Sequence, residues 1–244
     1  MNANAMQPFG AALLAFMRGE DNAELILHRE DGQQGRIPAG YFFREPAAFT
    51  AIEKTALEHC HGHVLDAGAG TGLHSLVLQQ NGLRVTAIDI DRQVVEIMQR
   101  RGVTSVHCAD IFEFHSGPFD TLLMLGHGIG MVETIAGLRR FLAHASRLIK
   151  PHGQCLLDSL DVTVTQDPVN LSYHQKNRQA GRYIGEIRMQ FEHQGMIGPP
   201  CGWLHVDAIT LQQEAEPQGW SCKVICAQDN GEYLARLTPK LSDE

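Results

Sequence analysis

The residues with the clearest chemical potential form a glycine-rich segment, DAGAGTG, that begins at Asp66. It directly follows a short apolar run that predicts a strand, and it precedes a predicted helix. Glycines at Gly68, Gly70 and Gly72 let the backbone take unusual dihedral angles and approach a ligand closely. The free N–H groups at the start of a helix favour an anionic group, and ligands of open α/β sheets bind where the strands end. We therefore predict a ligand-binding turn here.

Two further acids follow the next two predicted strands. Asp89 lies 23 residues after Asp66, and Asp110 comes just beyond the third strand. A carboxylate at Asp89 can accept hydrogen bonds from both hydroxyls of a ribose, while Ile90 covers one face of an adenine. Asp110, with Ile111 beside it, can accept from the adenine amino group. For both acids the alternative is a structural role as a cap of the following segment.

The type of ligand follows from what the turn lacks. A dinucleotide-binding turn carries a third glycine at the position that Leu73 occupies here. Asp66, so close to the turn, would also repel a diphosphate. S-adenosylmethionine (SAM) has no phosphate and carries an ammonium, a sulfonium and a single carboxylate, so an acid beside the turn suits it. We predict SAM as the cofactor; an NAD-linked oxidoreductase of the same fold is the alternative.

Strands and helices alternate between residues 62 and 158. Strands are predicted at 64–66, 84–89, 104–108, 119–125 and 154–158, helices at 73–81, 91–101 and 132–149, and a turn at 151–153. This spacing favours βαβ units that build a parallel sheet covered on both faces. The strand ends then share one edge, which brings the acids together. Asp91 is the predicted cap of the second of these helices.

The regions on either side of this alternation have a different pattern. Residues 159–181 are polar, 182–194 alternate like a half-exposed strand, and 202–206 are expected to return antiparallel, followed by a helix at 208–216 and strands at 221–227 and 232–238. At the other end we expect a helix at 8–19, a short strand and turn at 25–36, and a helix at 47–59. We predict a lid segment at 1–45 and a SAM-binding domain at 46–244, with an inserted β-hairpin cap at about 159–206.

The stretch VLDAGAGTG…VTAIDID…CADIF…FDTLLMLG…LIKPHGQCLLD resembles the class I SAM-dependent methyltransferases over about residues 62–158. The resemblance implies an α/β, three-layer, Rossmann-like fold with a seven-stranded, mostly parallel sheet whose last strand is antiparallel. It implies SAM lying across Gly68–Gly72, with Asp89 at the ribose and Asp110 at the adenine. Gly126 and His127 match the family position that faces the sulfonium and the methyl acceptor.

Several residues are candidates for the acceptor side. His127 is the predicted catalytic residue, because histidine takes up a proton near neutral pH; the alternative is a hydrogen-bonded histidine at a strand end. Candidate substrate contacts are Tyr41, Phe42, Tyr173, Arg178 and Arg182. The arginines suggest an acidic substrate, with a solvated surface as the alternative, and core packing is the alternative for the aromatic pair. No HExxH spacing occurs, and we predict no metal site.

Composition narrows the range of acceptors. The formal net charge of −8 argues against nucleic acid as a partner, because such binding depends on Lys and Arg. No N/D-PP-Y/F motif follows the fourth strand, which argues against amide or nucleobase nitrogen. We expect a cytoplasmic O- or N-methyltransferase that acts on a small molecule without a membrane partner; its oligomeric state has no signal in the sequence. A protein or RNA methyltransferase and a non-catalytic SAM-binding protein are the alternatives.

Overall fold

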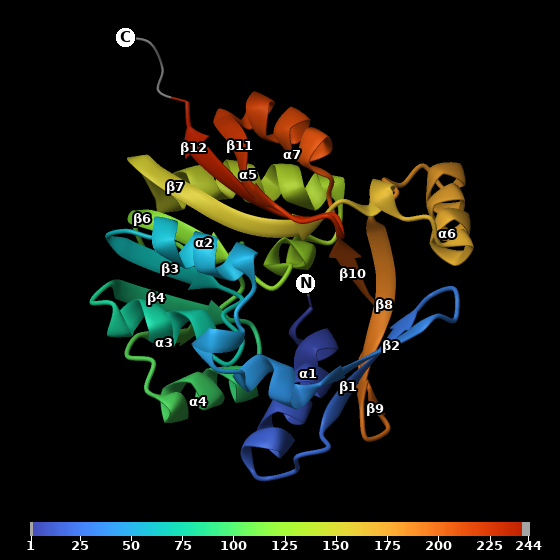
Figure 1. Cartoon of the computed structure of the whole chain (residues 1–244), viewed down its shortest axis with the longest axis horizontal. Helices are drawn as coiled ribbons and strands as arrows, with labels where there is room; N and C mark the ends of the chain where they lie inside the picture. Colours follow the sequence, from blue (N-terminus) through green and yellow to red (C-terminus); the bar gives the residue numbers. More distant parts are fainter. Residues whose placement is uncertain (1, 241–244) are drawn as a thin grey trace. The chain divides into compact units, whose positions relative to one another are not determined.

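The computed structural model describes residues 2–240, and the chain divides into two compact units. The first unit comprises residues up to 50, 61–114 and 188–201; the second comprises 51–60, 115–187 and 202 onward. Figure 1 shows the whole chain with its elements labelled. Across residues 2–240, no helix combines the length and the apolar character that crossing a bilayer requires.

The first unit contains three parallel strands, which are β3 (His63–Ala67), β4 (Arg84–Asp89) and β5 (Val106–Cys108). Helices α3 (Leu73–Gln80) and α4 (Arg92–Arg101) follow β3 and β4. Nearly every position of β3 and β4 is buried, as expected for strands that are covered on both faces. The three strands run in the same direction, so their carboxyl ends lie side by side.

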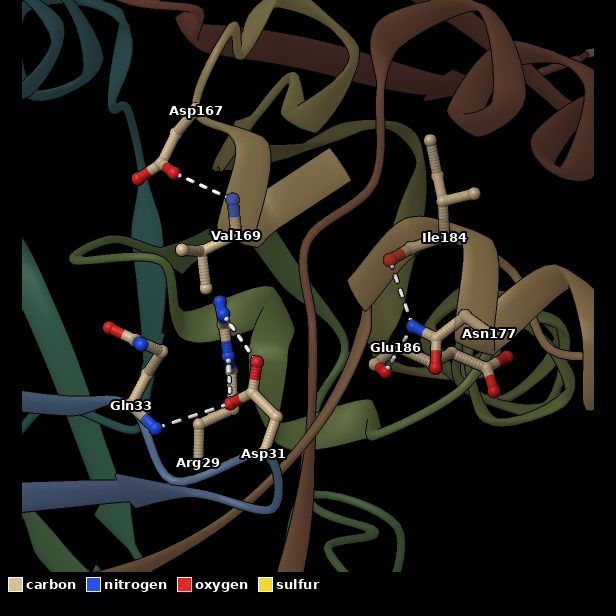
Figure 2. A network of polar contacts seen from close by, with 8 residues as sticks. All are labelled: Arg29, Asp31, Gln33, Asp167, Val169, Asn177, Ile184 and Glu186. Carbon is tan, nitrogen blue, oxygen red and sulfur yellow. Dashed lines mark hydrogen bonds and ion pairs between the residues drawn. The ribbon is translucent and has the colours of Figure 1, made fainter. Parts of the chain in front are cut away.

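The first unit also contains the N-terminal segment, made of α1 (Ala3–Met17), β1 (Glu24–Arg29), β2 (Gln34–Pro38) and the 3₁₀-helix η1 (Ala39–Phe43). Strands β1 and β2 form an antiparallel hairpin, and Asp31 in its turn accepts hydrogen bonds from Arg29 and from the Gln33 N–H (Figure 2). Strand β8 (Glu186–His193) pairs antiparallel with β1 and with the short β9 (Met196–Ile197). Figure 1 shows β8 running alongside β1.

The second unit contains the remaining strands of the large sheet. Strands β6 (Phe119–Met124) and β7 (Ile149–Leu160) are parallel, β12 (Glu232–Pro239) is antiparallel to β7, and β11 (Trp220–Ala227) is antiparallel to β12. Helices α2 (Ala51–His59), α5 (Ile135–Leu148) and α7 (Ala208–Ala215) pack against these strands. The other elements are the 3₁₀-helices η3 (Gly128–Val132), η4 (Val162–Val164) and η5 (Glu216–Gln218), helix α6 (Pro168–Gln179) and strand β10 (Cys201–Leu204).

The predicted fold class is confirmed. Seven strands form one sheet in the order β11-β12-β7-β6-β3-β4-β5, and its last strand in the sequence, β12, is antiparallel to both neighbours. The predicted cap is also confirmed, because Asp91 accepts from two N–H groups of α4. Asp207 caps α7 in the same way and accepts from the Thr210 N–H.

Two local predictions were wrong. Residues 151–153 belong to β7 rather than to a turn; a Cβ at Gly153 would lie 2.8 Å from the Asp120 carbonyl oxygen, so this glycine permits close strand packing. Residues 168–179, expected to be irregular, form α6, which Asp167 caps and Pro168 opens. The inserted segment contains the antiparallel strands β8 and β9, and β8 also pairs with β1 of the N-terminal segment.

Candidate functional site

The glycine-rich turn between β3 and α3 has a left-handed backbone at each of its three glycines. The φ angles are 71° at Gly68, 56° at Gly70 and 76° at Gly72. A Cβ at Gly72 would lie 2.6 Å from a methyl carbon of Val103, so no larger residue fits there without movement. Around Gly70, in contrast, a Cβ would meet no atom within 4 Å. The turn is therefore fixed on its inner side and open above Gly70, as a cofactor cradle requires.

Asp89, the last residue of β4, lies directly beside this turn. Its Oδ2 accepts a hydrogen bond from the Gly70 N–H at 3.1 Å, and its Oδ1 accepts from the Asp91 N–H at 3.0 Å. The side chain is 8% exposed, and this burial raises the pKa of the carboxyl to about 7. Each oxygen has a second lone pair for the hydroxyl groups of a ligand.

Asp66, near the carboxyl end of β3, is buried beneath the same turn. The Ser75 hydroxyl of α3 donates to its Oδ2 at 2.6 Å, which ties the strand end to the helix. Burial raises the pKa of Asp66, while His74 and the Ser75 hydrogen bond act in the opposite direction. Asp66 thus has a structural partner, and its direct contact with the cofactor stays a prediction.

Asp110 follows β5, the neighbour of β4. The Ala109 N–H donates to the Asp89 carbonyl oxygen at 2.9 Å, so the segment that carries Asp110 is attached to the end of β4. Asp110 also accepts from the Phe112 N–H at 2.9 Å, which is the structural role weighed against adenine binding. Of the two isoleucines, Ile90 is half-buried and Ile111 is buried. The three acids thus lie at or just beyond the carboxyl ends of neighbouring strands. The ligand contact of Asp110 and of both isoleucines stays a prediction.

A clamp on the glycine-rich turn was missed by the sequence reasoning. The buried Thr71 hydroxyl donates to the Phe42 carbonyl oxygen, and Arg101 at the end of α4 donates to both the carbonyl and the hydroxyl oxygen of Thr71 at 2.7 Å. The Arg101 guanidinium also lies 5.2 Å from the centre of the Phe43 ring. The hydrogen bonds alone join residues 29 and 30 positions apart, so no local sequence pattern predicts them.

The clamp brings the predicted aromatic substrate contacts next to the turn. Phe42 packs edge-on against Phe9 of α1, with ring centres 5.0 Å apart. Tyr41 is 49% exposed, and the Arg44 guanidinium lies 4.1 Å from the centre of its ring. Phe42 therefore contributes to packing, as the alternative held. Substrate contact by Tyr41 or Phe42 stays a prediction.

In the second unit, the segment after β6 carries the predicted acceptor-side residues. Gly126 is exposed with φ 69°, and His127 follows with φ 59°. The His127 N–H donates to Asp158 Oδ1 at 2.9 Å. Its imidazole Nε2 lies 3.6 Å from Glu232 Oε1, and its ring lies 5.3 Å from the ring of His205 at nearly a right angle. His127, His205 and Glu232 are called the histidine cluster below.

The remaining predicted substrate contacts lie on α6 or just after it. Tyr173 is buried, Arg178 is exposed and Arg182 is half-buried. Figure 2 shows how this region is held: the Asn177 amide of α6 donates to the carbonyl oxygens of Ile184 and Glu186 at 3.0 and 2.9 Å. The burial of Tyr173 indicates a packing role, and the substrate roles of all three stay predictions.

The fold and the turn together define an α/β protein with a site for an adenosyl ligand, and the comparisons with known proteins agree. A family model described as a methyltransferase domain matches residues 65–157. A solved SAM-dependent methyltransferase from Bacteroides fragilis, in complex with S-adenosyl-L-homocysteine, is 31% identical, with a TM-score of 0.85 over 99% of this chain and 98% of that one. The chain belongs to the class I SAM-dependent methyltransferases, and the prediction of SAM as cofactor is confirmed.

Curated relatives match over shorter segments. A demethylmenaquinone methyltransferase from Tropheryma whipplei is 29% identical over 99 residues, which is 38% of this chain and 40% of that protein. A magnesium-protoporphyrin O-methyltransferase from Rhodobacter capsulatus is 35% identical over 68 residues, which is 25% of this chain and 30% of that protein. The chain thus matches less than half the length of either relative.

Proposed function

We propose that this chain transfers the methyl group of SAM to an oxygen or nitrogen atom of a small molecule. The observation that carries the proposal is the glycine-rich turn with Asp89 beside it, in a chain that belongs to the SAM-dependent methyltransferases. Both curated relatives are named for small-molecule acceptors, and the net charge of −8 disfavours a nucleic-acid acceptor.

The residues of the chain fit this cofactor. The open space above Gly70 leaves room for the cofactor. The remaining lone pairs of the Asp89 oxygens suit the two ribose hydroxyls. When bound, SAM supplies an electrophilic methyl group on a positively charged sulfur. The contribution of the protein is then to orient the acceptor and to exclude water, and alignment alone can remove about 7–11 kcal/mol of the barrier.

Within this proposal His127 receives the proton that the acceptor loses. Histidine is suited to the step because its ordinary pKa lies near neutral pH. Candidate binding residues for the acceptor are Tyr41, Phe42, Arg178 and Arg182, on the N-terminal and inserted segments that we propose as a lid and a cap. Arginine in this set favours an acceptor that carries an acidic group.

Methyl transfer is tested with SAM labelled on its methyl group and three cell fractions: small metabolites, protein and RNA. We expect label in the small-metabolite fraction with the wild-type chain and much less with Asp89→Ala at the same subsaturating SAM concentration. Label in protein or RNA would favour a macromolecular acceptor instead. If SAM binds and no fraction takes up label, the chain is a SAM-binding protein without this activity.

A further inference from the structure

The backbone of His127 is held in a conformation that few non-glycine residues adopt. Its φ and ψ are 59° and 31°, in the left-handed region. Strain of this kind persists only where the surroundings enforce it, and it gathers at functional sites. Asp158 of β7 provides one restraint by accepting the His127 N–H. The backbone that carries the imidazole is therefore fixed before any ligand arrives.

The 3₁₀-helix η3 that follows His127 provides the other restraints. A Cβ at Gly130 would lie 2.1 Å from the Trp203 indole, so the loop and β10 are in tight contact. Glu133, at the far end of η3, also has a positive φ of 70° and packs against Gly202. The next N–H, that of Ile135, donates to Glu186 Oε1 at 3.0 Å.

His205, just after β10, is fixed as firmly as His127. Its N–H donates to the Gly185 carbonyl oxygen at 2.9 Å, and a Cβ at Gly185 would lie 1.8 Å from the His205 carbonyl oxygen. Its Nδ1 is buried and has no hydrogen-bond partner within residues 2–240. A buried N–H without a hydrogen-bond partner is rarer in proteins than a buried acceptor without one. We therefore place the proton of His205 on Nε2 and leave Nδ1 as the unpaired acceptor. Burial, with a smaller effect of nearby His127, lowers the pKa of His205 to about 3, and the ring is neutral at physiological pH.

Glu232, the first residue of β12, determines which imidazole nitrogen of His127 carries the proton. Its Oε1 lies 3.6 Å from His127 Nε2, close enough for attraction but longer than a hydrogen bond. A carboxylate at that distance favours a proton on Nε2, which leaves Nδ1 of His127 as the basic nitrogen. Among residues 2–240, the ionisable groups Glu232, His205 and Asp158 thus contact His127 from three different segments.

We propose that Glu232 and His205 are positioning residues that make His127 Nδ1 the proton acceptor in methyl transfer, and that the substrate is therefore a compound whose acceptor atom is a hydroxyl oxygen or a neutral N–H nitrogen. This inference rests on the proposed function. The acceptor forms a bond to the methyl carbon while the carbon–sulfur bond of SAM breaks and sulfur keeps its electron pair. The acceptor proton passes to His127 Nδ1, and Glu232 stabilises the imidazolium. His205 stays neutral and does not compete for that proton.

The first test needs no acceptor, because nitrogen NMR of the full chain reports the tautomer of each histidine. At about pH 8 we expect His127 to be in the Nε2–H form and His205 to be unchanged between about pH 5 and 8. Glu232→Gln should give a mixture of both His127 tautomers. His205→Ala should also give a mixture, because the His127 ring loses the neighbour that holds it in place. His205→Phe puts a neutral ring back beside His127 and should restore the Nε2–H form of His127. His152→Ala, at an exposed position of β7, is the matched control and should change nothing at His127.

Binding of S-adenosylhomocysteine to each variant verifies that it is folded. If Glu232→Gln leaves the His127 tautomer unchanged, or if His205 takes up a proton between about pH 5 and 8, the inference is wrong. Labelled transfer by His127→Ala at the wild-type rate would also overturn it and leave the proposed function intact. Absence of transfer in every fraction would refute the proposed function, whatever the tautomers are.

Discussion

At the scale of single residues, Asp89 has two properties that oppose each other. Its carboxyl is buried, which disfavours charge, yet both of its oxygens are engaged by backbone N–H groups, which prefer a carboxylate. Burial dominates and the pKa rises to about 7. Two ligand hydroxyls would add donors to the same oxygens and shift the balance toward the charged form. Cofactor binding and the charge of Asp89 are therefore coupled.

The first prediction removes this carboxylate. Asp89→Ala should weaken SAM binding about 10- to 100-fold, because charged hydrogen bonds contribute roughly 1.5–3 kcal/mol each. Isothermal titration calorimetry measures the affinity directly. Asp120→Ala, which removes a carboxylate paired with Lys150, is the control and should bind SAM as the wild type does. An unchanged affinity in Asp89→Ala would mean that the ribose binds elsewhere.

The second prediction concerns pH. Asp89 is protonated below about pH 7 and charged above it, and the hydroxyl donors prefer the charged form. SAM affinity should therefore rise with pH and be about tenfold weaker at pH 6 than at pH 8. In the free protein the sign is reversed: the folded pKa lies above the unfolded value of 3.8, so the contribution of Asp89 to stability is lost as the pH rises toward 7. Asp89→Asn should remove this pH dependence of binding, and a dependence that survives in Asp89→Asn would assign it to another group.

At the scale of elements, helix α4 connects the N-terminal segment to the cofactor site. Asp91 accepts hydrogen bonds from the N–H groups of Gln93 and Val94 at the start of α4. Helix α1 crosses here so closely that a Cβ at Gly10 would lie 2.5 Å from Asp91 Oδ1. At its other end α4 supplies Arg101, which holds the glycine-rich turn through Thr71. A loss of order in α4 should therefore reach the cofactor site.

The third prediction tests the start of α4. Asp91→Ala should lower the free energy of unfolding by about 1 kcal/mol, within a range of about 0.5–2, because two N–H groups lose their acceptor. Asp91→Asn retains an acceptor oxygen and should lose less. Urea unfolding measures both, with the exposed neighbour Arg92→Ala as control. Equal stability of Asp91→Ala and the wild type would show that water replaces the cap without loss.

Part of this architecture could be read from the sequence, and the reason differs between elements. The strand predicted at 84–89 matches β4, and the turn between β3 and α3 was located by its glycines, because buried apolar runs and glycine turns are local signals. Helix α6 was missed because its buried face is made of Tyr173, His174 and Asn177 rather than of an apolar stripe.

Contacts between distant segments could not be predicted. Strand β1 pairs with β8 across about 160 residues, as in the pair Leu27 and Phe191, and neither strand contains information on its partner. The same holds for the candidate site. His127 was identified because it follows the fourth predicted strand, at a position that matches the methyltransferase family. His205 and Glu232 lie far from it in the sequence, and only the fold brings them into contact with it.

At the scale of the whole molecule, a ligand that binds only the folded chain stabilises all of it by mass action. SAM at about 100 times its dissociation constant should add about 2.7 kcal/mol to the free energy of unfolding. For a chain of this size each kcal/mol raises Tm by about 2–4 °C, so a rise of about 5–10 °C is expected in a thermal unfolding scan. NAD at the same concentration should leave Tm unchanged, because Leu73 replaces the third glycine of a dinucleotide-binding turn. Asp89→Ala should lose most of the rise with SAM. A rise in Tm with NAD and none with SAM would contradict the conclusion that the glycine-rich turn and Asp89 bind SAM.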